Sequence, residues 1–334
     1  MATGLSLPGN PRGYGFFPGR LARRGVRCFT QIQGQCRGKG RENGRRERDC
    51  ATASEPGGRE TGTGDAHEEV TVEREDLEAM AERGDYSALV EAMADPQPFI
   101  RLHASEILAS LGERVVPLLI DALDHHHPEV RKGAARALGE IGSREALMPL
   151  IIKLDKDIPS VGQFIVEALA KIGDSSVVPI LCRCTRHHSL PIRYSAVRSL
   201  GNLGDRRAVP FLIDNLSDTA NIVRLRAVES LARIGEPSLW SPISELLSDE
   251  SAGVRAAAAR ALGNMGNPRA VDALIGLLGS DVETDLLEAA RALGKLKSRR
   301  ALAHLKAARE REGREKVIQA LDEAIRRIES DVQA

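Results

Sequence analysis

Two groups of histidine and cysteine side chains are the first candidates for chemistry in this sequence. One is DHHHPE at residues 124–129, and the other is CRCTRHH at residues 182–188. Cys184 and His188 are four residues apart, so a helix would place a thiol and an imidazole on one face, as in the start of a metal site. However, Cys182 falls in register with the isoleucines of a repeat described below, which indicates a core position. The two groups lie two repeats apart, roughly 20 Å, which is too far for one ion. We therefore predict no metal site.

A recurring arginine is the second candidate, because a row of guanidinium groups could bind phosphates. The arginine follows the first apolar residue of a helical segment at Arg101, Arg131, Arg193, Arg224 and Arg255. Asp95, Asp218 and Asp249 each stand six residues before one of these arginines. His125 and His187 occupy that place in two other copies, and we expect Asp124 to do the work of the aspartate beside His125.

A third pattern alternates in charge. It comprises Glu106, Arg136, Glu167, Arg198, Glu229, Arg260 and Arg291, which we call the groove stripe. If successive copies stack, each of these side chains lies next to one of opposite charge, except that Arg260 and Arg291 are both basic. One interpretation is a row of surface salt bridges, each contributing a few tenths of a kcal/mol. The other is a row of charges that selects a partner by steering association and excluding wrong molecules.

The elements that carry these residues repeat along the chain. Gly142, Gly173, Gly204, Gly235 and Gly266 are each 31 residues apart, and Lys297 occupies the next register. Apolar residues before each glycine recur at the 3.6-residue period of an amphipathic helix, and a second such pattern follows. The glycine suits the left-handed residue that ends a helix, since it has no Cβ. A fixed period of this length predicts a stack of repeats rather than a globule.

Each period therefore contains two helices of ~12 residues that must pack on neighbouring pairs to bury their apolar faces. We predict an all-α, right-handed α-solenoid of about eight helix pairs between residues 86 and 329. Within a repeat domain at 67–334, residues 72–83 are expected to form a capping helix. Residues 298–329 are densely charged and lack the closing glycine, as expected of a terminal cap. Small residues recur three positions after the groove stripe, where close helix packing is the simplest reason for them.

The segments VRKGAARALGEIG, VRLRAVESLARIG and VRAAAARALGNMG resemble HEAT repeats, and more closely the short variant of the phycobilisome lyases. The resemblance covers residues 70–330. It implies that the arginines bond to aspartates along the stack and that the second helix of each pair faces the concave side. Some HEAT-repeat proteins are iron-dependent hydroxylases, and these carry His-Glu dipeptides as iron ligands in successive repeats. Here the dipeptide occurs only as His67–Glu68, outside the array.

Residues 1–66 differ from the array. They hold 14 of the 31 glycines, and residues 1–50 carry 11 Arg/Lys against 3 Asp/Glu. Such a segment cannot bury enough apolar surface to fold, so we predict disorder. It is a flexible tail or a non-native start, a basic arm for a polyanion, or a targeting segment. The five cysteines form no disulfide framework, and the longest apolar runs are too short to span a bilayer, so we expect a cytoplasmic protein without a membrane anchor.

The sequence contains no phosphate loop and no signature of a protease or hydrolase, so we predict no catalytic residue and no cofactor. We expect a scaffold that binds another protein, or an extended segment of one, along the concave face. The predicted partner-binding residues are Arg136, Glu167, Tyr194, Arg198, Leu225, Glu229 and Arg260. The resemblance leaves open an accessory role like that of the phycobilin lyases on a tetrapyrrole-carrying protein. Nucleic-acid binding through the basic residues 1–50 is a second alternative.

Overall fold

The structure, a computed structural model, describes residues 73–333 of the chain. These residues form helices and turns and contain no strand, which confirms the all-α prediction. They belong to one compact unit, residues 67–334. The predictions for residues 1–66 lie outside the described residues.

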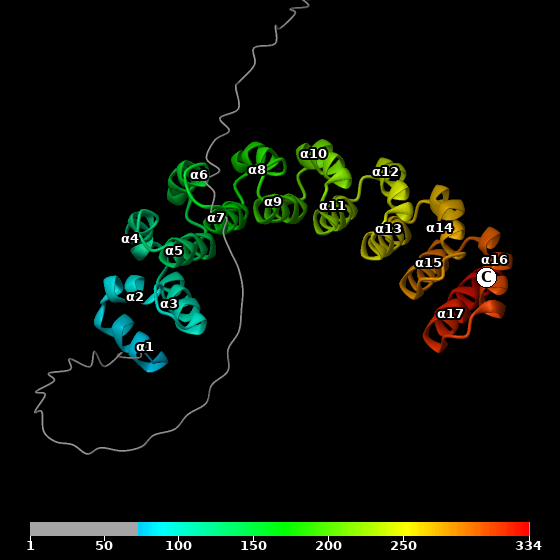
Figure 1. Cartoon of the computed structure of the whole chain (residues 1–334), viewed down its shortest axis with the longest axis horizontal. Helices are drawn as coiled ribbons and strands as arrows, with labels where there is room; N and C mark the ends of the chain where they lie inside the picture. Colours follow the sequence, from blue (N-terminus) through cyan, green and yellow to red (C-terminus); the bar gives the residue numbers. More distant parts are fainter. Residues whose placement is uncertain (1–72, 334) are drawn as a thin grey trace, which may run out of the picture. The chain divides into compact units, whose positions relative to one another are not determined.

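Eight helix pairs follow one another, as predicted. The first helices are α2 (Tyr86–Ala92), α4 (Val116–Ala122), α6 (Leu147–Leu154), α8 (Val178–Cys184), α10 (Val209–Asp214), α12 (Trp240–Glu245), α14 (Val271–Leu277) and α16 (Leu302–Arg311). The second helices are α3 (Pro98–Ser110), α5 (Pro128–Ile141), α7 (Pro159–Ile172), α9 (Leu190–Leu203), α11 (Asn221–Ile234), α13 (Ala252–Met265), α15 (Glu283–Leu296) and α17 (Glu315–Gln333). Figure 1 shows the first helices as an outer row and the second helices as an inner row on the concave side of the array.

The first helices are shorter than predicted. Most of them contain 6 to 8 residues, because a 3-10 turn such as η4 (Arg206–Ala208) forms the entry to the helix. The second helices from α3 to α15 are slightly longer than predicted, with 13 or 14 residues, and α17 has 19. Five of them end in a left-handed glycine. Lys297, at the end of α15, takes the same conformation with φ of 51°, although a side chain makes it costly.

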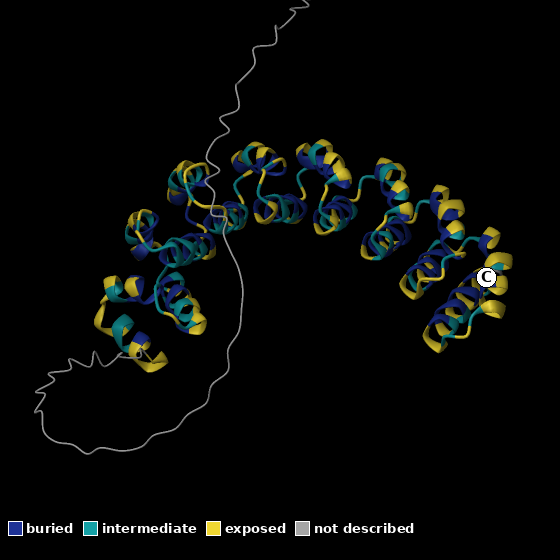
Figure 2. Cartoon of the chain, in the orientation of Figure 1, coloured by how far each residue is buried: buried dark blue, intermediate teal, exposed yellow. Residues whose placement is uncertain are grey.

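The core lies between the two rows and between successive second helices (Figure 2). The small residues predicted to allow close packing do so. A Cβ added to Gly139 would lie 2.7 Å from Cα of Ala168 on the next second helix, and one added to Gly263 would lie 2.7 Å from Cα of Ala292. The spacing between second helices therefore leaves no room for a side chain at these positions.

Both ends of the array carry caps. α1 (Arg74–Arg83) precedes the first pair and begins two residues later than the predicted capping helix. Its N-cap, Glu73, forms a reciprocal capping box with Asp76. At the other end, α17 packs Val317, Leu321 and Ile328 into the core, and α16 and α17 place their many charged side chains toward solvent.

Candidate partner-binding surface

The recurring arginines hold successive repeats together, as the resemblance implied. Arg193 binds Asp218 of the next repeat through Nε and Nη2, at 2.7 and 2.9 Å. Arg224 binds Asp249 at the same two distances. In each case Nη1 donates to carbonyl groups of the arginine's own inter-helix turn, such as that of Asp218 beside Arg224, at 2.9 Å. We call this set the arginine ladder: Arg101, Arg131, Arg193, Arg224 and Arg255.

The electrostatics of the ladder agree with its geometry. Burial opposes ionisation of Asp218 and Asp249, but the hydrogen bond from the guanidinium group, the bond from a backbone N–H and the nearby positive charges together outweigh it, so the pKa of each carboxyl lies below its ordinary value. The same bonds raise the pKa of Arg193 and Arg224. Guanidinium groups engaged in this way are poor ligands for phosphate.

Two ladder positions differ from the sequence expectation. Arg101 pairs with Glu129 at 3.4 Å, since His125 stands where the next repeat would offer an aspartate. Arg255 pairs at 2.8 Å with Asp285, which lies on α15 rather than in a turn. Both arginines find a carboxylate of the following repeat in spite of the change in position.

The histidines replace the turn aspartates. In an ordinary repeat the Asp249 carboxylate accepts a hydrogen bond from the backbone N–H of Ser251 at 2.8 Å. Nδ1 of His187 accepts the same bond from Ser189 at 3.0 Å, and Nδ1 of His125 accepts it from His127 at 3.1 Å. The prediction that Asp124 substitutes for His125 is wrong, because Asp124 pairs instead with Lys153.

The cysteines beside the second histidine group are core residues. Cys182 and Cys184 are buried at 3% and 5% exposure, and burial raises the pKa of the Cys184 thiol to about 11. Trp240 is partly buried against the core. Within residues 73–333, no three metal-ligating side chains gather at one point. None of the helices in that range has the length and apolar character needed to cross a bilayer.

All seven predicted partner-binding residues lie on second helices, from α5 to α13, in the inner row. Arg198 of α9 forms a salt bridge of 2.9 Å with Glu167 of α7, whose carboxylate also accepts from the Ser195 hydroxyl at 3.0 Å. Tyr194 accepts a hydrogen bond at 2.9 Å from Arg226, which in turn pairs with Glu229 at 2.7 Å. The centre of the surface therefore holds two polar clusters, one between α7 and α9 and one between α9 and α11.

The predicted alternation of salt bridges along the groove stripe is wrong for most of its members. Of its opposite-sign neighbours, only Glu167 and Arg198 pair within the described part of the chain. Arg260 binds Glu288 at 3.4 Å instead, and Glu229 binds Arg226 on its own helix. These partners stand three residues before the stripe position on each helix, where they face the preceding second helix.

The position three residues before each groove-stripe residue holds side chains that the sequence analysis did not predict to belong to the surface. Arg226 lies over the ring of Tyr194 at 5.3 Å from its centroid, and Arg136 lies over Phe164 at the same distance. Glu288 joins Arg260 to Arg291. The signal was present in the sequence: the aligned residues at this position are large or charged in several copies, although a buried stacking position would hold small or apolar residues.

Hollows in the surface lie along the same helices. One of about 610 Å³ is lined by residues of α3, α5 and α7, among them Leu102, Glu106, Arg136 and Lys171. A second, of about 340 Å³, shares Leu102 and Arg136 and reaches Phe164. A third, of about 140 Å³, lies between α15 and α17. The inner face thus combines paired charges, half-buried aromatic rings and shallow depressions.

Comparison with protein families finds the repeat unit across most of the array. Residues 86–161, 148–232 and 212–288 match the model of HEAT repeats, and residues 286–310 match that of the PBS lyase HEAT-like repeat. No curated protein matches the chain.

Comparison with solved structures finds one that shares the fold and others that align along much of the chain. The Escherichia coli protein YibA is 18% identical, with a TM-score of 0.57 over 74% of this chain and 97% of that one. Human deoxyhypusine hydroxylase is 22% identical over 76% and 99% of the two chains, with a TM-score of 0.35. The complex of CpcE and CpcF of phycocyanin lyase from Nostoc sp. is 22% identical over 64% and 94%, with a TM-score of 0.42.

Proposed function

The chain belongs to the HEAT-repeat family, and we propose that it is a non-enzymatic scaffold that binds a partner protein along its inner row of helices. Stacked repeats build an extended surface of this kind, because each repeat adds one more layer in the same orientation.

One observation carries the proposal: two sets of charged residues on the same helices are used differently. The ladder arginines are enclosed; the side chains of Arg224 and Asp249 are each 8% exposed. Side chains of the groove stripe remain open, with Arg198 at 42% and Arg260 at 51% exposure. The stack therefore encloses the first set, whereas the second set stays exposed to another molecule even where its members pair with carboxylates.

Apolar groups lie among these charges. Tyr194 and Leu225 are partly buried on adjacent helices, and Leu225 lies against the start of α13 near Gly253. Phe99 and Leu102 of α3 are 55% and 40% exposed. Partly covered aromatic and aliphatic side chains surrounded by charges are typical of the centre of a protein interface, where they supply most of the affinity.

In this proposal the protein performs no covalent step. Guanidinium and carboxylate groups of the inner face pair with one another, as Arg198 does with Glu167. In the proposal they supply recognition, and the exposed charges direct a partner into register.

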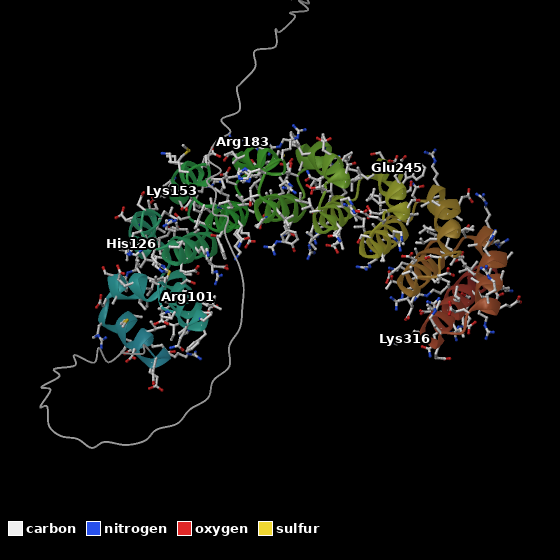
Figure 3. All side chains as sticks on the ribbon, viewed as in Figure 1. Arg101, His126, Lys153, Arg183, Glu245 and Lys316 are labelled. Carbon is white, nitrogen blue, oxygen red and sulfur yellow. The ribbon has the colours of Figure 1, made fainter. Side chains whose placement is uncertain are left out.

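The experiment is affinity capture with the tagged full-length chain and quantitative mass spectrometry of the retained proteins. The groove variant combines Tyr194→Ala with Arg198→Gln. The matched control is Arg183→Gln, which removes an arginine of the outer helix α8 (Figure 3). Circular dichroism should give both variants the helicity of the parent.

We expect at least one protein to be captured by the parent and the control and lost by about tenfold from the groove variant. That protein, once purified, should bind the parent directly. If every captured protein is retained equally by the groove variant and the control, the inner face is not the binding surface.

A further inference from the structure

We propose that the half of the groove between α9 and α15 binds an acidic protein segment in extended conformation. This inference rests on the proposed function and specifies the chemistry of the partner. It comes from a second line of residues, one helical turn after the groove stripe, which we call the second stripe: Ser110, Glu140, Lys171, Asn202, Arg233, Asn264 and Lys295. All seven are exposed, and Glu140, Lys171 and Lys295 line hollows of the inner face.

At the start of the array, the charges of the groove stripe and of the second stripe balance each other. On α5, Arg136 is followed one turn later by Glu140, and on α7, Glu167 is followed by Lys171. Lys171 also forms a salt bridge with Glu140 across the two helices. In this part of the groove every base of the stripes has an acid next to it.

Compensation within a helix is lost on α9, α13 and α15, whereas α11 keeps it through Glu229 and Arg233. Asn202 and Asn264 stand where an acid would balance Arg198 and Arg260, and on α15 both stripe positions are basic. Lys295 donates to the side-chain oxygen of Asn264 at 2.7 Å, and Arg233 donates to that of Asn202. Amide oxygens orient these two cations without neutralising them.

The two stripes therefore carry a net positive charge between α9 and α15. From α9 to α15 the two stripes contain five bases, Arg198, Arg233, Arg260, Arg291 and Lys295, and one acid, Glu229. Glu288, between Arg260 and Arg291, serves two guanidinium groups with a single charge. The described chain as a whole has 35 Lys/Arg against 39 Asp/Glu, so this basic surface is a local exception in an acidic array.

Geometry favours an extended segment. Successive second helices are about 10 Å apart, and an extended chain rises about 3.3 Å per residue, so one repeat corresponds to about three residues. Bases occur on each of the four helices from α9 to α15. A segment with an acidic residue at every third position would therefore meet one base in each layer.

A polynucleotide fits this surface less well. The carboxylates of Glu167, Glu229 and Glu288 lie among the bases and would repel a continuous row of phosphates. Arg226 lies over the ring of Tyr194, where it takes the place that a stacked base would need on that face. Spaced carboxylates avoid both obstacles.

The test uses fluorescence anisotropy with the full-length chain and three labelled probes. The first is a 16-residue peptide with Glu at every third position between Gly and Ser; the second has Gln in place of Glu; the third is a 16-nucleotide oligothymidine. The groove variant is Asn202→Asp with Asn264→Asp, which removes no base and restores the missing compensation. The matched control, Ser238→Asp with Ser241→Asp, adds the same two charges at exposed positions next to and on the outer helix α12.

We expect the groove variant to bind the Glu peptide about tenfold more weakly than the parent, at about threefold for each added carboxylate, while the control stays within twofold. The Gln peptide should bind equally weakly to all three proteins. Equal affinity of the groove variant and the control for the Glu peptide would overturn the inference. So would an oligonucleotide that binds the parent more tightly than the Glu peptide and loses as much affinity in the groove variant.

The two proposals can fail separately. If a captured partner depends on Tyr194 and Arg198 but is indifferent to the two Asn→Asp changes, the scaffold function stands and the acidic segment is refuted.

Discussion

Removal of one ladder arginine should lower the free energy of unfolding far more than removal of an exposed arginine that also connects two repeats. Arg224 and Asp249 are each 8% exposed and share two hydrogen bonds of 2.7 and 2.9 Å. In Arg224→Gln the enclosed Asp249 carboxylate keeps only the hydrogen bond from the backbone N–H of Ser251. Breaking a buried ion pair by removing one partner costs about 3–5 kcal/mol, and glutamine retains part of the stem, so we expect a loss of about 3 kcal/mol.

The matched control is Arg183→Gln. Arg183 also connects two repeats, through a single bond of 3.2 Å to Asp155, but the two side chains are 64% and 68% exposed. Its removal should cost less than about 0.5 kcal/mol. Urea titration followed by circular dichroism at 222 nm measures both values, and hydrogen exchange at the turns around Asp218 and Asp249 should report local opening in Arg224→Gln alone. A difference between the two variants of less than about 1 kcal/mol would refute a structural role for the ladder.

Three further outcomes follow from single positions. Gly201→Ala should destabilise the array by about 1–3 kcal/mol in urea titration, because the added Cβ would lie within 2.8 Å of atoms on α11, whereas Gly276→Ala, with open space around it, should be neutral or stabilising. Lys297→Gly should raise the melting temperature by removing a left-handed side-chain residue, a gain of about 1 kcal/mol; no rise would mean that its φ of 51° is unstrained. Burial and the neighbouring His188 charge lower the pKa of His187 in the folded chain. The unfolded chain therefore binds a proton more readily than the folded chain, and the free energy of unfolding should fall as the pH drops below about 6.5. His187→Asn retains a turn acceptor and should remove that fall, which urea midpoints between pH 5 and 7 would detect.

The repeat period was sufficient to predict most of the fold. Glycine at a fixed register identifies the left-handed helix end, and the same register places the ladder arginines and the small packing residues. These features are readable because each satisfies a local requirement within one repeat or between two neighbours. The entry turns were not readable in the same way, since a 3-10 turn and a first α-helical turn present the same apolar pattern.

The candidate surface was predictable only in part. Its position on the second helices followed from the resemblance, but its pairing depends on which rotamer each long side chain adopts. Arg226 turns toward Tyr194 rather than toward the next repeat, and Glu288 attracts both Arg260 and Arg291. Sign alternation along one stripe could not reveal this, because exposed charges have several partners of nearly equal energy within reach.

A residue that departs from the repeat pattern can be explained by a departure in the preceding repeat. Gly162 stands where a ladder arginine would be, so the following turn has no ladder guanidinium to bind, and His187 in place of the aspartate keeps the turn's own hydrogen bond from Ser189. The reason for the histidine therefore lies in the preceding repeat, 25 residues earlier.

The central claim is that each helix pair packs on its neighbours alone and that the signature residues make those contacts. Deletion of residues 205–235, one full period, tests it most directly. The deletion would bring Arg193 opposite Asp249 and Gly201 opposite Ala261, which are compatible with the contacts they replace. We predict that the shortened chain keeps the parent's helicity per residue and unfolds cooperatively in urea, as judged by circular dichroism. Loss of helicity, or unfolding without a cooperative transition, would contradict the claim.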